Sequence, residues 1–367
     1  MVVNELSSGN FVGSARYASD LGMLSIVVEP KVPVYRLAGI IEYVQEGRVF
    51  SDELAEVYGA HTDILSLQLH RCVRLVLSSL AAGSVRGYRQ LEREVACIKG
   101  RPNLVKLVCE APLQAKQSVH CCFSDHTINT PRNQVYRAAL VKCAKILSER
   151  GSVQALDAAR MTIYSLNAVD NKDLSKNQIE GIARAHLKDS ATLLACRDVI
   201  CGLSISPHPG IAREFFSYAI NMATLFEDYC YRLMSTVLAE FDIRPSDDLT
   251  FPLDGGGQTI KLDGLFGEIP NQILMECKYK SIRSIPDLSR ADIYQTVSYC
   301  CHVNLRPMVA VICVPAFEDD APVELLGTIG GFRAAKGKIH VLSISLSHRP
   351  DELEAGLAAV FSRLLEE

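Results

Sequence analysis

The sequence lacks the segments that would mark a membrane-spanning or secreted protein. Its 367 residues contain no apolar run of about 20 residues, and its start does not show the charged-then-apolar order of a signal peptide. We therefore expect a cytoplasmic chain without membrane contact. The apolar fraction of 48% and the charged fraction of 22% are typical of a folded globular protein, and the length is sufficient for two or three domains.

A nucleotide-binding phosphate loop is also missing. The pattern G-x-x-x-x-G-K-[ST] has no match in the chain. The nearest candidate runs from Gly331 to Gly337-Lys338, but it has five intervening residues and places Ile339 where serine or threonine is required. The chain is therefore not expected to hydrolyse nucleotides by itself.

The 13 cysteines contain no C-x-x-C pair, which argues against a zinc site of common spacing. Two adjacent doublets occur, Cys121-Cys122 and Cys300-Cys301, and most of the other cysteines fall inside apolar runs. Such positions are typical of reduced cysteines that pack as small hydrophobic side chains. We predict neither disulfides nor a zinc site from them.

The stretch Ile260–Lys280 predicts two short strands joined by a tight turn at Gly267–Asn271. The first strand ends at Leu262-Asp263 and the second carries Glu276 and Lys278 on one face. In a hairpin, Asp263 can lie beside that face. Two carboxylates and an ammonium group would then converge, and carboxylate oxygens of this kind suit Mg²⁺.

Such a site is equipped to hydrolyse a phosphodiester, because Mg²⁺ polarises the phosphate and a lysine can hold an attacking water. The plain alternative is an ordinary hairpin with a solvated face. The surrounding pattern favours the site. An apolar helical period covers 213–241, a capping box at Ser289–Asp292 precedes a helix over 293–303, and Pro307–Pro315 is typical of a buried strand. Gln295 and Tyr299, four residues apart, share a face of that second helix.

An acidic residue followed by E-x-K on adjacent strands resembles the PD-(D/E)xK nuclease superfamily. The run Glu276–Lys280, followed by Asp292–Gln295 and Tyr299, is similar to the McrC subunit of McrBC-type restriction systems. Looser similarities to that family occur in the amino-terminal half, at Ile26–Lys31, around Arg86-Gly87-Tyr88 and at Phe123–Asn133. Two departures stand out: Glu276 where the family commonly has aspartate, and Leu262 in place of the proline of the Pro-Asp pair.

The resemblance implies an α/β fold (α+β overall) with a carboxy-terminal PD-(D/E)xK core, and it implies roles for particular residues. Asp263 and Glu276, with the backbone carbonyl of Cys277, would hold Mg²⁺. Lys278 would position or activate water, and Gln295 would support the site from the following helix. Glu227, in an L-F-E run of the upstream helix, would face the metal, although a surface glutamate is the alternative interpretation.

The resemblance also implies a division of labour. A separate AAA+ GTPase would recognise double-stranded DNA carrying modified cytosine, and this chain would dock on that motor, stimulate its GTPase and cut. Two alternatives stay open: a stand-alone nuclease with its own DNA-binding region, and a regulatory adaptor whose nuclease fold is vestigial.

We predict three regions: a β/α region over residues 1–110 that docks on the motor, a mainly helical region over 111–205, and the nuclease domain over 206–367. Lysine and arginine outnumber aspartate and glutamate by 24 to 20 in residues 1–205, whereas residues 206–367 have 14 against 22. The acidic nuclease half therefore lacks the charge to hold DNA tightly by itself. Basic residues do gather beside the proposed site (Lys278, Lys280, Arg283, Arg290) and between Arg86 and Arg101, where DNA, an acidic partner or solvent could be their counterpart.

Overall fold

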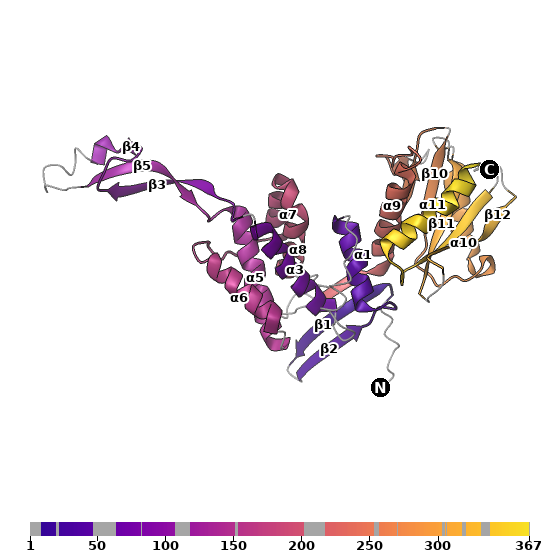
Figure 1. The fold of residues 1–367 in the computed structure, drawn as a ribbon, viewed down its shortest axis with the longest axis horizontal. Coiled ribbons are helices and arrows are strands. Elements are labelled where there is room, and N and C mark those ends of the chain that lie inside the picture. Colours follow the sequence, from indigo (N-terminus) through magenta and orange to yellow (C-terminus); the bar gives the residue numbers. More distant parts are fainter. Residues whose placement is uncertain are drawn as a thin grey trace. The chain divides into compact units, whose positions relative to one another are not determined.

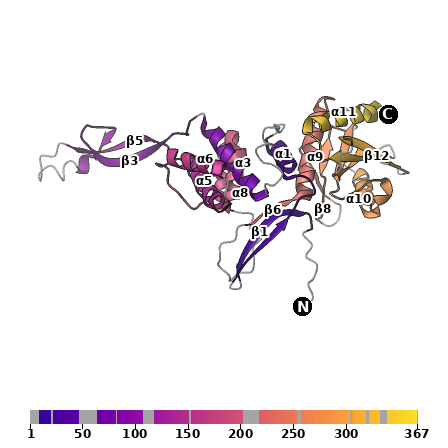
Figure 2. The ribbon, with the colours of Figure 1, turned by 60° about the horizontal axis from the view of Figure 1, so that its bottom comes forward.

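A computed structural model describes residues 9–19, 22–46, 64–81, 83–106, 118–150, 153–201, 217–252, 257–269, 271–302, 305, 307–317, 321–331 and 338–366. The chain has a mixed α/β fold, as predicted, and its elements form two compact units (Figures 1 and 2). One unit combines Met1–Leu67 with Ile205–Glu367, and the other consists of Gln68–Ser204. In sequence, the second unit is therefore inserted into the first.

The amino-terminal strands belong to the same unit as the carboxy-terminal half. Strand β1 (Phe11–Ser19) lies between β2 (Gly22–Val28) and β6 (Ser217–Asn221), and it pairs antiparallel with both. Because β1 is hydrogen-bonded to a strand that immediately precedes the carboxy-terminal core, the first strands group with that core. The two compact units divide the chain at residues 67 and 204, whereas the three predicted functional regions stay a prediction.

Helix α1 (Val34–Glu46) packs on the carboxy-terminal core through Tyr43. The Tyr43 hydroxyl donates to Glu354 Oε1 at 2.6 Å, and its ring meets that of Tyr229 edge-on at 5.5 Å between centroids. Arg232 donates to the Val44 carbonyl at 3.1 Å. These contacts join the amino-terminal segment to helices α9 (Met222–Ala239) and α11 (Pro350–Glu366) of the same unit.

The core sheet has five strands in the order β12-β13-β11-β10-β9. The three central strands run parallel, and the two edge strands are antiparallel to their neighbours. Their bounds are Gly264–Phe266 (β9), Gln272–Cys277 (β10), Pro307–Ala316 (β11), Val323–Gly330 (β12) and Lys338–Ser345 (β13). The buried strand predicted at Pro307–Pro315 is confirmed as β11, which is buried along most of its length.

The predicted hairpin is confirmed as β9 and β10, but its first strand lies after Asp263 instead of ending there. The preceding strand β8 (Thr259–Lys261) pairs with β7 (Thr250–Pro252) in a separate ribbon, so Asp263 sits in the short link between β8 and β9. The tight turn begins at Gly267, whose φ is +78°. A side chain there would also meet the Asn271 carbonyl oxygen at 2.6 Å, so the turn requires glycine.

Helices cover both faces of this sheet. Helix α9 (Met222–Ala239) and helix α11 (Pro350–Glu366) pack together, and Figure 2 shows α10 (Arg290–Cys300) on the other side of the sheet from α11. Along β10, Leu274 belongs to the cluster packed under α10. Glu276 shares that face of the strand, and Cys277 points to the opposite one.

Both predicted helices are present with different starts. The helix expected over 213–241 begins at Met222, because Asn221 ends β6 and caps the helix by accepting from Ala223 N and Thr224 N; residues 213–216 lie outside the described residues. The helix expected over 293–303 begins one turn earlier, at Arg290, since Ser289 is the capping residue itself.

The second unit combines helices with a three-stranded sheet. Its helices are most of α3 (Ile64–Ala81), α5 (Pro131–Arg150), α6 (Val153–Ser165), α7 (Lys176–Ala185) and α8 (Ser190–Cys201). The sheet consists of β3 (Gly87–Val95), β5 (Val119–Thr127) and the short β4 (Arg101–Pro102), in the order β3-β5-β4. By length and composition alone, helix α3 could cross a membrane. However, 56% of its 18-residue length is buried inside the protein, as in a core helix.

Candidate active site

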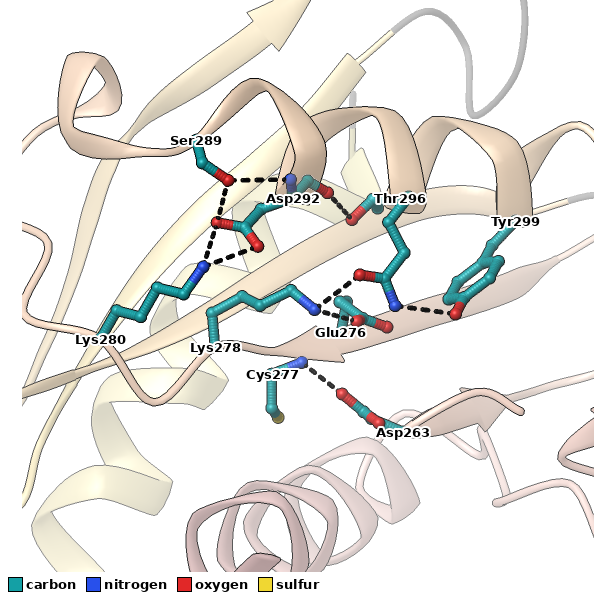
Figure 3. Close-up of polar contacts among 10 residues, drawn as sticks. Asp263, Glu276, Cys277, Lys278, Lys280, Ser289, Asp292, Thr296 and Tyr299 are labelled. Atoms are coloured by element: carbon teal, nitrogen blue, oxygen red, sulfur yellow. Dashed lines mark hydrogen bonds and ion pairs between the residues drawn. The ribbon is translucent and has the colours of Figure 1, made fainter. Parts of the chain in front are cut away.

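A chain of hydrogen bonds links β10 to α10 at the carboxyl end of β10 (Figure 3). Lys278 Nζ donates to Glu276 Oε1 at 2.6 Å and to Gln295 Oε1 at 2.9 Å, and Gln295 Nε2 donates to the Tyr299 hydroxyl at 2.8 Å. The ammonium group is therefore held between a carboxylate of the strand and an amide of the helix. The predicted shared face of Gln295 and Tyr299 is present.

Asp263 reaches the same place from the link before β9. Pairing of Gly264 with Met275 sets Asp263 opposite the end of β10, where its Oδ2 accepts from the Cys277 amide at 2.7 Å. The structure thus brings together Asp263, Glu276 and Lys278, the three side chains that the sequence motif singles out. The Cys277 contact uses its amide nitrogen, so the role of its carbonyl as a metal ligand stays a prediction.

Glu276 is almost completely buried, and only one of its two carboxylate oxygens is hydrogen-bonded to Lys278. Its side chain is 2% exposed, and its Oε2 atom has no hydrogen-bond partner among the described residues. The pKa of Glu276 is raised to about 7, because burial and then the charge of Asp263 raise it more than the hydrogen bond from Lys278 lowers it. An unpartnered buried oxygen beside a second carboxylate is an environment that a bound cation would stabilise.

The pKa values of two neighbouring carboxyl groups, Asp263 and Glu227, are also raised. Burial raises the pKa of Asp263, while the Cys277 amide and Lys278 lower it. Burial and the charge of Asp263 raise the pKa of Glu227, which lies on α9 and is half-buried. Glu227 also contributes to the raised pKa of Glu276. Three carboxyl groups therefore interact here, and the role of Glu227 toward a metal stays a prediction.

Lys278 keeps its proton in this environment. Burial by itself would lower the pKa of Lys278, but the hydrogen bond and the charge of Glu276 outweigh burial and raise it. Two ammonium groups, those of Lys278 and Lys261, act on the three interacting carboxyl groups, so negative charge stays in excess. A hard divalent cation such as Mg²⁺, which takes carboxylate oxygens and water as ligands, fits the donors present at Asp263 and Glu276.

A second ion pair, between Lys280 and Asp292, fixes the start of α10. Lys280 Nζ donates to both oxygens of Asp292, at 2.9 and 2.7 Å, and Ser289 Oγ donates to Asp292 Oδ2 at 2.6 Å. The capping pattern predicts the Ser289–Asp292 contact but gives no indication of Lys280. Because Asp292 and Gln295 lie one turn apart, this pair also fixes the position from which Gln295 reaches Lys278.

The raised pKa of Glu276 predicts a pH-dependent stability. The pKa of this carboxyl has its ordinary value of 4.5 in the unfolded chain and is raised to about 7 in the folded protein. Below 4.5 it is protonated in both states. Between the two values the folded state binds more protons, so the free energy of unfolding falls as pH rises, by about 3 kcal/mol at most, and stays low above about 7.

The variant Glu276→Gln isolates this effect. Its free energy of unfolding should decrease less than that of the parent protein between about pH 5 and about pH 8. Urea unfolding in the presence of a chelator measures both slopes. Equal slopes for the two proteins would show that Glu276 titrates normally.

Comparison with known proteins identifies the family of this chain. The family described as McrBC 5-methylcytosine restriction system component matches residues 6–309. A search of curated proteins finds no match. Among solved structures, a chain in the half-complex of Thermococcus gammatolerans McrB AAA+ hexamers with bound McrC is similar at a TM-score of 0.65 with 14% identity, over 96% of this chain and 83% of that one. A chain in the Thermococcus gammatolerans McrBC complex gives a TM-score of 0.46 with 15% identity, over 62% of this chain and 67% of that one.

The family match extends over most of the chain, including the link that carries Asp263 and the strand and helix that carry Glu276, Lys278 and Gln295. It confirms the resemblance indicated by the motifs, and the first of the two structures has the same fold at low identity. This chain belongs to the McrBC 5-methylcytosine restriction system component family.

Proposed function

We propose that this chain is the McrC-type, Mg²⁺-dependent DNA endonuclease subunit of a GTP-driven restriction system that acts on modified DNA in the cytoplasm. The observation that supports this most strongly is the buried Glu276 carboxylate, with one unpartnered oxygen, beside Asp263 and Lys278. In this proposal the carboxy-terminal core is a PD-(D/E)xK nuclease core. The order of α9, β9, β10, α10 and β11 is the order expected of that class.

Each side chain has a role in phosphodiester hydrolysis. When bound, Mg²⁺ would supply Lewis-acid polarisation of the scissile phosphate. Asp263 and Glu276, with the Cys277 carbonyl, would hold it. Lys278, oriented by Glu276 and Gln295, would position the attacking water and stabilise the charge that develops on the phosphate. Glu227 would orient a water or ligand from the side of α9.

A separate AAA+ GTPase would deliver the double-stranded DNA, which would carry modified cytosine. The chain itself has no phosphate loop, and its half that carries the site is acidic. The similar solved structure contains McrB AAA+ hexamers with bound McrC. We therefore propose that this chain docks on an McrB-like motor and stimulates its GTPase.

The proposal is tested by mixing the purified chain with an McrB-like AAA+ GTPase, which the proposal expects to be encoded beside it, together with GTP, Mg²⁺ and methylated or unmodified plasmid. We expect cutting of methylated plasmid only when all components are present, and faster GTP hydrolysis when this chain is added. Cutting without the motor would favour a stand-alone nuclease. Stimulated GTPase without any cutting would favour a regulatory adaptor.

Gln295 is expected to act through Lys278. Gln295→Ala removes one acceptor of the Lys278 ammonium, so cleavage should decrease about 10- to 100-fold, the usual effect of losing a group that orients a reactive one. Cleavage of methylated plasmid by the full complex is the measurement. The control is Ser298→Ala, which changes an exposed residue on the same helix. Normal cleavage by Gln295→Ala would show that Gln295 has no role in the site.

A further inference from the structure

Three buried cysteines from different elements meet on the face of β10 opposite Glu276. They are Cys230 on α9, Cys277 on β10 and Cys313 on β11, and their three sulfur atoms all lie within 4.8 Å of one another. Cys277 and Cys313 are directly paired in the parallel register of β10 and β11, and α9 places Cys230 over both. The proposed hydrolysis of DNA uses none of these thiols.

The spacing suits one metal ion bound by three sulfurs. A zinc–sulfur bond is about 2.3 Å, so three thiolates around one ion lie about 3.8–4.0 Å apart. Sulfurs that already lie within 4.8 Å of one another need to approach by less than about 1 Å. Thiolate sulfur selects soft cations, whereas the carboxylates on the other face select hard ones.

A second group of buried cysteines in the chain is arranged differently. Cys72 interacts with both Cys143 and Cys196, and its Sγ lies 3.9 Å from Cys196 Sγ. Among the described residues, however, only the sulfurs of Cys230, Cys277 and Cys313 all lie within 4.8 Å of one another. The contacts through Cys72 therefore lack the mutual closeness of all three sulfurs that one shared ion requires.

We propose that Cys230, Cys277 and Cys313 form a thiolate site for one soft d¹⁰ cation, Zn²⁺ or Cu⁺. Each thiol that binds the ion releases its proton to solvent. Coordination number favours Cu⁺, because zinc usually takes four ligands and no histidine, aspartate or glutamate among the described residues completes this group. Charge favours Zn²⁺, which neutralises more of the buried negative charge.

The ion would connect α9 to the two strands that support the proposed active site. Its binding should therefore stabilise this unit against unfolding, by mass action on the folded state. The site does not depend on the proposed nuclease activity, since its ligands point away from Glu276 and Lys278.

The test is titration of the reduced full-length protein with Zn²⁺ or Cu⁺, without oxygen and with excess Mg²⁺ to occupy the carboxylates. We expect one equivalent of one of these ions to bind, with a sulfur-to-metal charge-transfer band and a raised melting temperature. Cys313→Ala should lose all three signals. Cys300→Ala, which removes a buried thiol outside the group, should keep them, and so should Asp263→Asn.

Circular dichroism confirms that each variant is folded, and Cys277→Ala replaces Cys313→Ala if the latter does not fold. Binding by Cys313→Ala or Cys277→Ala that equals binding by the parent protein would overturn the proposal. Failure of the parent protein to bind either ion more tightly than these variants would also overturn it. Loss of binding in Asp263→Asn would assign the ion to the carboxylates instead.

Discussion

Replacing Asp263 with alanine should decrease DNA cleavage by about 10³-fold or more. Asp263 is one of two carboxylates at the end of β10, and the loss of a metal ligand removes several kcal/mol of charge stabilisation in the transition state; about 4 kcal/mol corresponds to roughly 10³-fold. The measurement is the rate of cleavage of methylated plasmid by the complete system. GTP hydrolysis by the motor should stay stimulated, because Asp263 lies outside the region over residues 1–110 that we expect to dock on the motor.

The control for Asp263→Ala is Glu268→Ala. Glu268 is an exposed acidic residue in the turn between β9 and β10, so its removal changes the charge of the hairpin without touching the site. Cleavage by Glu268→Ala should stay within a few-fold of normal. Near-normal cleavage by Asp263→Ala would refute the assignment of the metal site.

Replacing Lys278 with alanine should decrease cleavage by about 10²- to 10³-fold, the usual effect of removing one group that stabilises transition-state charge. Lys278 is 14% exposed and is the donor that contacts both Glu276 and Gln295. Without it, Glu276 loses the hydrogen bond that lowers its pKa, so that pKa should rise. At limiting Mg²⁺, the pH at which the cleavage rate increases should therefore be higher for Lys278→Ala than for the parent protein.

Lys280→Ala makes the same change of charge two residues away. Lys280 is 54% exposed and pairs with Asp292, which keeps its contacts with Ser289 when Lys280 is removed. We expect cleavage to decrease about tenfold at most. Equal losses for Lys278→Ala and Lys280→Ala would mean that only the local positive charge matters, which would contradict a specific role for Lys278.

The geometry of the site was largely predictable because it depends on local rules. Alternation along β10 places Glu276 and Lys278 on one face, and helical spacing places Gln295 beside Tyr299. The partner of Lys280 was not predictable, because strand β10 and the start of α10 are joined by a segment whose path no local pattern determines. The raised pKa of Glu276 was also inaccessible, since it follows from burial between elements that are distant in sequence.

The basic residues beside the site illustrate the same limit. The sequence suggests a positive cluster that could steer a phosphate backbone. In the structure, Lys278 pairs with Glu276 and Lys280 pairs with Asp292, so these two charges are already balanced within the protein. Both lysines hold side chains of the site in place, which agrees with a chain that depends on another protein to bring DNA.

The burial of the cysteines was predictable from the sequence, but their grouping in space was not. Their positions inside apolar runs predict buried, reduced thiols, and Cys230, Cys277 and Cys313 are buried free cysteines. Spacing motifs could not identify them as neighbours, because they come from a helix and two strands and meet only through the pairing of β10 with β11. A ligand set assembled from three elements leaves no C-x-x-C pattern.

The pairing of β1 with β6 has a consequence for protein engineering. A fragment that starts at residue 206 would contain the whole five-stranded sheet, yet its β6 would have lost its hydrogen-bonded neighbour. The exposed strand edge would favour association between fragments. A minimal fragment that carries the candidate active site should therefore retain the first strands of the chain, fused by a short linker to the segment that begins at β6.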